Sequence, residues 1–181
     1  MSNPTCRLVQ LKAPERHPEL VAQVEAIFWQ TSVRTFAPGS ERDAFRERWL
    51  GRYMQGGSDV VLLALVGEDT VAGYLVGSLE NPAEQARFAD IGYFRTDFAD
   101  PTKRFPAHLH INLAADFRSR GIGAQLIEAF AASARRAGAP GMHAVTGKGM
   151  RNVGFYARCG FVERATALWN GREIVFLGRE L

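Results

Sequence analysis

The stretch Arg118-Ser119-Arg120-Gly121-Ile122-Gly123-Ala124 separates a strand-like segment from a helix-like one. Residues 107–114 before it read Ala-His-Leu-His-Ile-Asn-Leu-Ala, in which apolar and polar positions alternate as they do in a β-strand. Residues 122–137 after it place apolar side chains three and four positions apart, which predicts a helix with one buried face. The glycines therefore lie where a strand turns directly into a helix N-terminus.

A turn of this kind suits an anion. Gly121 and Gly123 lack Cβ atoms and accept unusual φ values, so backbone N–H groups can approach a phosphate where the helix dipole also favours negative charge. Arg118 and Arg120 add positive charge. The spacing is neither Gly-x-Gly-x-x-Gly nor Gly-x-x-x-x-Gly-Lys-Ser/Thr, which disfavours nicotinamide and nucleoside triphosphate ligands. By itself the pattern indicates an anion site and no particular ligand.

Strands and helices alternate on both sides of this turn. Apolar β-rich runs predict strands at residues 6–11, 60–66, 71–79, 142–146, 161–164 and 174–177, and 3.6-residue periodicity predicts helices at 18–30, 41–54 and 151–159. The four residues between the runs at 60–66 and 71–79 predict a β-hairpin. This order is typical of an α/β or α+β sheet protein.

Two aromatic patterns leave their roles open. Phe45, Trp49 and Tyr53 are spaced by four in the helix expected over 41–54, a spacing that favours core packing over ligand binding. Residues 81–105 show no periodicity but contain several aromatic side chains. A long segment of this kind is either a substrate lid or a part of the core.

A second motif follows the first at residues 152–161, Asn-Val-Gly-Phe-Tyr-Ala-Arg-Cys-Gly-Phe. The two motifs, in this order, resemble those of the GCN5-related N-acetyltransferase (GNAT) superfamily. Its pyrophosphate loop reads Arg/Gln-x-x-Gly-x-Gly/Ala, and its later motif reads Asn-x-x-(x)-Phe-Tyr-x-x-x-Gly-Phe. The resemblance is strong over residues 107–163 and only architectural before them. Residues 93–95 and 105–111 are also similar to a bacterial subgroup akin to the acetyltransferase-like domain attached to O-GlcNAcase.

The resemblance implies a fold, a co-substrate and a reaction. The fold is a central mixed, mostly antiparallel twisted sheet of about six to seven strands flanked by about four helices. Acetyl-CoA is the acetyl donor and no metal is needed. The acetyl group passes from the thioester to a primary amine by direct attack. The acceptor is a small-molecule amine or a protein amino group, and which of these it is stays open.

Site residues carry over position by position. The pyrophosphate loop maps onto residues 118–124, and the backbone that pairs with pantetheine maps onto Ile111 and Leu113. Asn152 corresponds to a residue that contacts pantetheine. Tyr156, one turn later on the same helical face, corresponds to the general acid that protonates the leaving thiolate.

The general base is less closely specified. His108 and His110 alternate on one face of the strand before the loop, and some arylalkylamine acetyltransferases carry a similar pair as a proton relay. A histidine in a strand is more often structural, and a register shift of one residue would turn the pair to the other face. Asn112 stands on that face where a carboxylate would act directly, and an amide cannot accept the proton. Either histidine, or a water relay, therefore remains a candidate.

Length and composition set further expectations. The chain of 181 residues fits a single domain over 1–181, and its net charge of +3 is weak evidence for nucleic acid. Residues 1–4 lack the features of a signal peptide and no run is long enough to span a bilayer, so we expect a cytoplasmic protein without membrane contact. Cys6 and Cys159 are too few for a disulfide scaffold. Many GNAT relatives form dimers, and a homodimer is one expectation here.

Two other functional classes compete with an active enzyme. A chain with this fold could be a non-catalytic module that binds acetyl-CoA or a protein partner. The arginine clusters could also serve nucleic-acid binding, although no recognised nucleic-acid motif accompanies them.

Overall fold

A computed structural model describes residues 6–32 and 34–181. The segment considered for a signal peptide, residues 1–4, lies outside these ranges. The chain divides into two compact units. The first consists of the chain up to Gly77 together with His110–Phe130, and the second of Ser78–Leu109 together with Ala131–Leu181. Strand β4 (Ala107–Leu113) and helix α4 (Ile122–Arg136) pass from one unit into the other.

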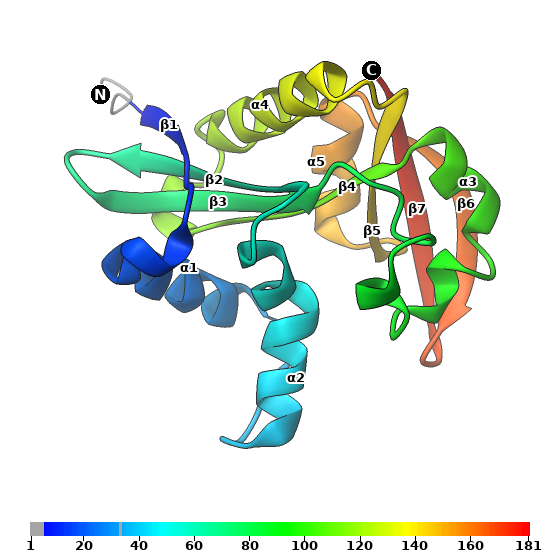
Figure 1. Cartoon of the computed structure of the whole chain (residues 1–181), viewed down its shortest axis with the longest axis horizontal. Coiled ribbons are helices and arrows are strands. Elements are labelled where there is room, and N and C mark those ends of the chain that lie inside the picture. The colour runs from blue at the N-terminus through cyan, green and yellow to red at the C-terminus, as the bar shows by residue number, and fades with distance from the viewer. Residues whose placement is uncertain (1–5, 33) are drawn as a thin grey trace. The chain divides into compact units, whose positions relative to one another are not determined.

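The first unit is built on the strand order β1-β2-β3-β4. β1 (Cys6–Gln10) pairs antiparallel with β2 (Asp59–Val66), and the expected hairpin is formed by β2 and β3 (Thr70–Ser78). Helix α1 (Pro18–Thr31) packs on this hairpin, as Figure 1 shows. Its Gln23 binds the hairpin turn with both ends of its amide, accepting from the Val71 N–H at 2.9 Å and donating to the Asp69 carbonyl at 3.0 Å.

The helix expected over residues 41–54 is interrupted. Helix α2 (Ser40–Trp49) ends before Leu50, and a 3-10 turn, η2 (Gly51–Met54), follows. A Cβ at Gly51 would meet the carboxylate of Glu47, the end of a flexible and exposed side chain that can move aside. The change of direction places Tyr53 fully inside the unit, whereas Phe45 and Trp49 remain half-buried.

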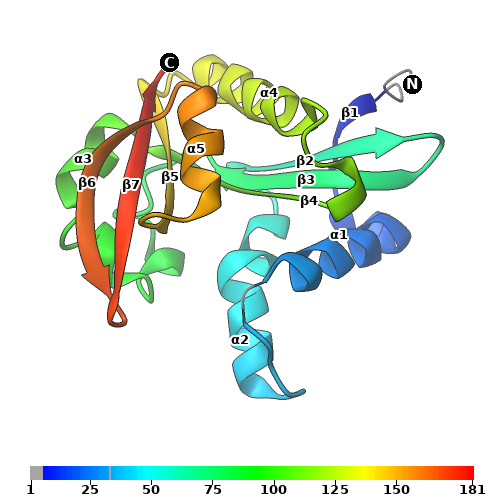
Figure 2. The same cartoon turned by 180° about the vertical axis from the view of Figure 1, so that it is seen from behind.

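The second unit has the strand order β4-β5-β7-β6. β5 (Gly141–Gly147) runs parallel to β4, with Ala107 opposite Met142 and His108 opposite His143. β7 (Arg172–Glu180) pairs antiparallel with both β5 and β6 (Val162–Trp169). Helix α5 (Arg151–Arg158) covers one face of β5, β6 and β7, and the segment that contains α3 (Ala99–Arg104) covers the other, as Figures 1 and 2 show.

The aromatic segment 81–105 belongs to the core of the second unit. It contains two 3-10 turns, Ala86–Phe88 and Gly92–Phe94, before α3. The buried aromatic side chains, all at most 4% exposed, are Phe88, Tyr93, Phe94, Phe98 and Phe105. Burial of these rings stabilises the unit by roughly 1.5–3 kcal/mol each. The segment is packed core, which answers the choice between lid and core.

The expected fold class is confirmed. The described residues form seven strands, which pair mostly antiparallel with one parallel pair at β4 and β5, together with five α-helices. None of the helices in this part of the chain is both long and apolar enough to cross a bilayer. Cys6 and Cys159 are not joined by a disulfide.

Candidate active site

The glycine loop of the first unit has the backbone of an anion site. Ser119 and Gly121 both adopt left-handed φ values, 59° and 78°, so the chain winds tightly between β4 and α4. The first helical bond runs from the Gln125 N–H to the Gly121 carbonyl at 3.2 Å. The N–H groups of Ile122, Gly123 and Ala124 therefore lie in the first turn of the helix, where no carbonyl of the same helix can accept a hydrogen bond from them. A Cβ added at Gly121 would meet no atom within 4 Å, so the space in front of it is open.

The loop is held rigidly from both ends. Ile122, Leu126, Ile127 and Phe130 lie on one face of α4 and are at most 3% exposed. On the other side of the loop, Arg118 donates from Nε to the Leu113 carbonyl at 3.1 Å, which links the loop to the end of β4. Arg118, Ser119 and Arg120 are exposed. Two cationic side chains thus flank backbone N–H groups that have no acceptor within the helix, an arrangement that suits a phosphate.

Strand β4 leads into this loop. Ile111 and Leu113 are half-buried. Between them, the Asn112 amide donates to the Tyr74 hydroxyl at 2.9 Å. Asn112 is thus held by a buried tyrosine of β3 and is not a base, as its chemistry requires.

His110 is enclosed by side chains of α2 and η2. Its Nε2 lies 3.1 Å from the Tyr53 hydroxyl. The rings of Trp49 and Tyr53 each form a T-shaped pair with the imidazole, with centroids 5.3 Å apart. The ring is half-buried, and its Nδ1 has no hydrogen-bond partner among the residues that the structure describes. Burial, together with the nearby Arg52 guanidinium, lowers the pKa of His110 to about 4. The imidazole is therefore neutral, and able to accept a proton, throughout the neutral range.

The lowered pKa of His110 predicts a loss of stability in acid. In the unfolded chain this histidine takes up a proton near its ordinary pKa of about 6.5, whereas in the folded chain it does so only near 4. Its contribution to stability is therefore complete above pH 6.5 and is lost as the pH falls from 6.5 to 4, by about 1–3 kcal/mol for a half-buried ring. Urea unfolding of the wild type and of His110→Gln at pH 7.5 and 4.5 measures this term. A free-energy difference between the two proteins that does not change with pH would contradict it.

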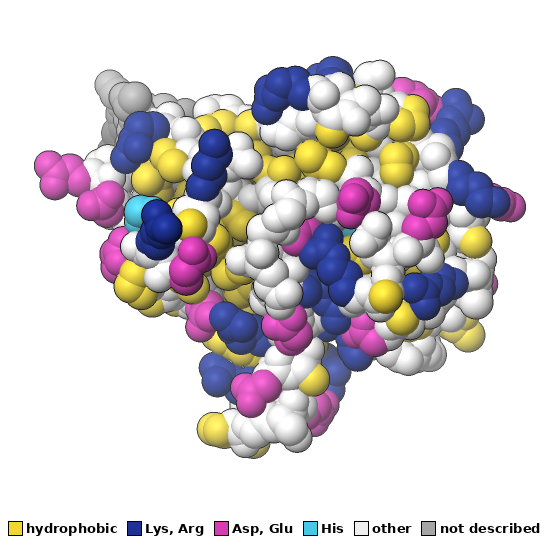
Figure 3. Space-filling view, viewed as in Figure 1, with side chains coloured by type: hydrophobic (Ala, Val, Ile, Leu, Met, Phe, Trp, Pro, Cys, Tyr) yellow, Lys and Arg dark blue, Asp and Glu magenta, His cyan; other side chains and the backbone are white. Residues whose placement is uncertain are grey.

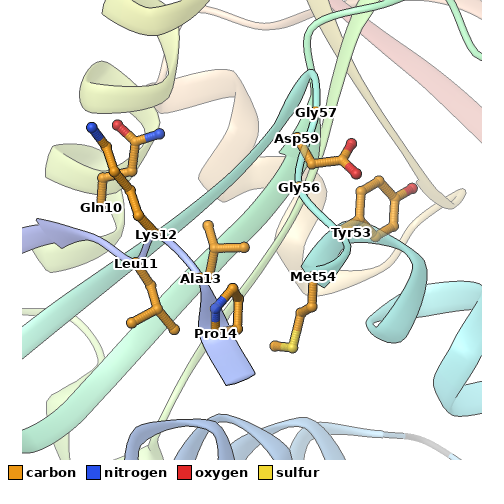
Figure 4. Close-up of a pocket in the computed structure, with 11 residues that line it drawn as sticks. Gln10, Leu11, Lys12, Ala13, Pro14, Tyr53, Met54, Gly56, Gly57 and Asp59 are labelled. Atoms are coloured by element: carbon orange, nitrogen blue, oxygen red, sulfur yellow. The ribbon is translucent and has the colours of Figure 1, made fainter. Parts of the chain in front are cut away.

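A cavity of about 280 Å³ lies in the first unit beside Tyr53. Figure 4 shows Leu11, Ala13 and Pro14 on one side of it and Tyr53 and Met54 on the other. The Tyr53 hydroxyl points away from Ala13 and Pro14. The tyrosine therefore lines the cavity with its ring while its hydroxyl reaches His110.

His108, which the sequence treats like His110, has different surroundings in the second unit. It is 2% exposed and contacts the rings of Phe88, Phe94 and His143, with centroids 4.8–5.7 Å away. His143 in turn stacks on Phe176 and binds the Phe105 carbonyl through Nδ1. His108 is thus part of a buried aromatic cluster.

Asn152 and Tyr156 lie on α5 in the second unit. The Thr146 hydroxyl of β5 donates to Asn152 Oδ1 at 3.0 Å, which fixes the amide and leaves its N–H₂ group as the donor. Tyr156 is 5% exposed and packs against Phe155 and Phe161. Burial, and more weakly the charge of Cys159, raises the pKa of Tyr156, so its hydroxyl stays protonated and can donate.

The arginines around α2 do not form a uniformly positive surface. Arg46 is paired with Glu25, and Arg34 with Glu41 at 2.6 Å. Figure 3 shows basic and acidic side chains mixed over α2. Mixed charge of this kind weakens the nucleic-acid alternative, because phosphate backbones attract concentrated positive charge. Within the described ranges no three His, Cys, Asp or Glu side chains are grouped as metal ligands.

Two residues of these sites were missed by reasoning on sequence. The spacing of Tyr53 with Phe45 and Trp49 predicts core packing, which the full burial of Tyr53 confirms, but this spacing does not indicate the contact with His110. Gly51 is a signal that the helix ends before Tyr53. Thr146 lies at the end of the strand expected over residues 142–146. Nothing in its spacing indicated a contact with Asn152.

Comparison with known proteins agrees with the fold and with both motifs. The model of the acetyltransferase (GNAT) family matches residues 21–161. The structure of SsHAT is 21% identical, with 98% of each chain covered and a TM-score of 0.72. The NatC complex bound to Gag peptide and CoA contains a chain that is 12% identical, with 97% of this chain and 98% of that chain covered and a TM-score of 0.64.

A third similar structure comes from Bacillus anthracis str. Ames. It is assigned as a streptothricin acetyltransferase and is in complex with acetyl coenzyme A. It is 16% identical, with 72% of this chain and 67% of that chain covered and a TM-score of 0.54. At these identities the likeness of the solved structures is one of fold. The family model, in contrast, spans both motifs, and the chain belongs to the GNAT acetyltransferase family.

Proposed function

We propose that the chain is an acetyl-CoA-dependent N-acetyltransferase that acetylates a primary amine by direct attack on the thioester. The observation that carries this proposal is the backbone of the glycine loop. Left-handed Ser119 and Gly121 lead into the open N-terminus of α4 directly after β4. Family membership supports acetyl-CoA as the ligand of such a loop.

The residues of the first unit fit the donor's pyrophosphate and pantetheine. The opening N–H groups of α4, at residues 122–124, hold the pyrophosphate, and Arg118 and Arg120 neutralise its charge. Backbone groups of Ile111 and Leu113 pair with pantetheine as a further strand would. In the second unit, the Asn152 amide donates to a pantetheine carbonyl while Thr146 holds its oxygen.

Acetyl-CoA supplies an activated acyl group, and side chains of the protein accept and donate the protons that the reaction moves. Attack makes the amine N–H much more acidic, so a weak base is sufficient to remove the proton as the new bond forms. The half-buried His110, with its unpartnered Nδ1 among the described residues, supports a base role better than the fully buried His108 does. Tyr156 donates its hydroxyl proton or a hydrogen bond to the departing thiolate.

Thiol release from acetyl-CoA across a panel of amines tests the proposal. The panel includes a polyamine, an aminoglycoside, an arylalkylamine and peptides with a free lysine or a free N-terminus. We expect at least one amine to raise thiol release well above the hydrolysis background. Tight acetyl-CoA binding by calorimetry without turnover of any amine would refute the enzyme and support the non-catalytic module.

Replacing Tyr156 by Phe is expected to lower kcat at least about 10-fold while acetyl-CoA affinity changes less than about twofold, because only the proton donor is lost. Steady-state kinetics and calorimetry measure the two quantities. Tyr93→Phe is the matched control, since Tyr93 is a similarly buried tyrosine of the same unit, 4% exposed. Equal kcat values for the two variants would show that Tyr156 acts only in packing.

A further inference from the structure

Tyr53 lies between the cavity of the first unit and His110 and contacts both. The side chain is fully buried, its ring lines the cavity, and its hydroxyl lies 3.1 Å from His110 Nε2. The interruption of α2 before Leu50 brings it there, since Tyr53 belongs to the 3-10 turn and not to the helix. Neither motif of the family includes this residue.

We propose that Tyr53 is a positioning residue that holds His110 in one tautomer. Its phenolic oxygen accepts the Nε2–H of His110, and the lone pair of Nδ1 is left to take the proton from the acceptor amine. This assignment rests on the proposed function, in which His110 is the base. A buried neighbour that fixes the tautomer of a catalytic histidine is a general feature of histidine bases.

The hydrogen bonds of the two nitrogens favour this tautomer. Nδ1 has no acceptor among the described residues, so an N–H placed there would be a half-buried donor without a protein partner. Such a donor is left with water as its partner and forgoes a hydrogen bond within the protein. With the hydrogen on Nε2, the donor is satisfied by Tyr53 and only a lone pair remains on Nδ1.

The same arrangement survives the proton transfer. When the amine nitrogen bonds to the acetyl carbon and the carbon–sulfur bond breaks, the amine proton passes to Nδ1. The Nε2–H···O bond to Tyr53 is unchanged by this step, so no group has to rotate. In the opposite tautomer, the Tyr53 hydroxyl would donate to Nε2 and would block the only nitrogen that could accept the proton.

Nitrogen NMR of the imidazoles tests the tautomer without any turnover. The ¹⁵N-labelled protein is measured at pH 7.5, and the His110 signals among the four histidines are identified by their loss in His110→Gln. We expect the Nε2–H tautomer to predominate in the wild type. In Tyr53→Phe we expect the ratio of the Nε2–H to the Nδ1–H tautomer to fall at least about twofold toward an even mixture. Tyr74→Phe removes an equally buried hydroxyl that binds Asn112, and it is expected to leave His110 as in the wild type.

Kinetics add a second readout. Tyr53→Phe is expected to lower kcat about two- to tenfold with KM for acetyl-CoA changed less than about twofold. An even mixture of tautomers accounts for a loss of about twofold, and the loss of the hydrogen bond that orients the imidazole accounts for the rest. An Nδ1–H tautomer in the wild type, or the same ratio in Tyr53→Phe, overturns the positioning role. Correct tautomers with no turnover of any amine would instead refute the proposed function and leave the tautomer assignment standing.

Discussion

His110→Gln is expected to lower kcat for amine acetylation by about 10²–10³-fold, with acetyl-CoA affinity unchanged. A general base contributes about 10²–10⁴-fold. The glutamine amide can still donate to the Tyr53 hydroxyl, so the packing of η2 against β4 is kept while the proton acceptor is lost. Thiol release with the best amine of the panel, followed in a stopped assay and in the steady state, measures the effect.

The pH dependence of this reaction has an expected form. Because the pKa of His110 is lowered to about 4, the histidine is already neutral at pH 5 and its titration does not limit the rate near 6.5. The rate instead rises with pH as the acceptor amine loses its proton, since a lysine-like amine has a pKa of about 10.4. An inflection near pH 6.5 that disappears in His110→Gln would contradict the lowered pKa.

Two histidine variants separate base chemistry from packing. His17→Gln changes a histidine whose side chain lies at the surface 3.9 Å from Glu19, and it is expected to leave kcat unchanged. His108→Gln disturbs the aromatic cluster of the second unit and lowers thermal stability. If His108→Gln loses kcat without loss of stability and His110→Gln does not, the base role belongs to His108.

Gly121→Val is expected to weaken coenzyme A binding at least about 30-fold, which corresponds to about 2 kcal/mol. A valine side chain would fill the space in front of the loop and keep the pyrophosphate from the N–H groups of α4. The left-handed φ of 78° also strains any β-branched residue, at a cost of about 1–2 kcal/mol in stability. Calorimetry with coenzyme A gives the affinity, and urea unfolding gives the stability.

Gly138→Val is the matched control for this strain. Gly138 follows the other end of α4 with a φ of 79°, and a Cβ there also meets no atom within 4 Å. Both variants should lose similar stability, and only Gly121→Val should lose affinity. Equal coenzyme A affinities in the two proteins would refute the assignment of this loop as the pyrophosphate site.

Features that depend on local chemistry can be predicted from the amino-acid sequence. The alternation at residues 107–114 predicts the strand, Gly121 predicts the turn, and the apolar face of residues 122–137 predicts the helix. Each of these signals is a property of a short stretch of chain. Asn152 and Tyr156 share a helical face for the same reason. The fold class and the family follow from these two motifs in order.

Residues with the same local pattern acquire different surroundings through contacts that are distant in the sequence. His108 and His110 are equivalent in an alternating strand, yet one lies among Phe88 and Phe94 and the other meets Tyr53. Residues 81–105 became core because aromatic burial does not require periodicity. Tyr53 reaches His110 because α2 ends at Trp49 and Tyr53 belongs to the 3-10 turn that follows, so the helical spacing of its aromatic neighbours does not extend to it. Contacts between residues 57 positions apart carry no local signal, so the partner of the proposed base could be found only in the folded chain.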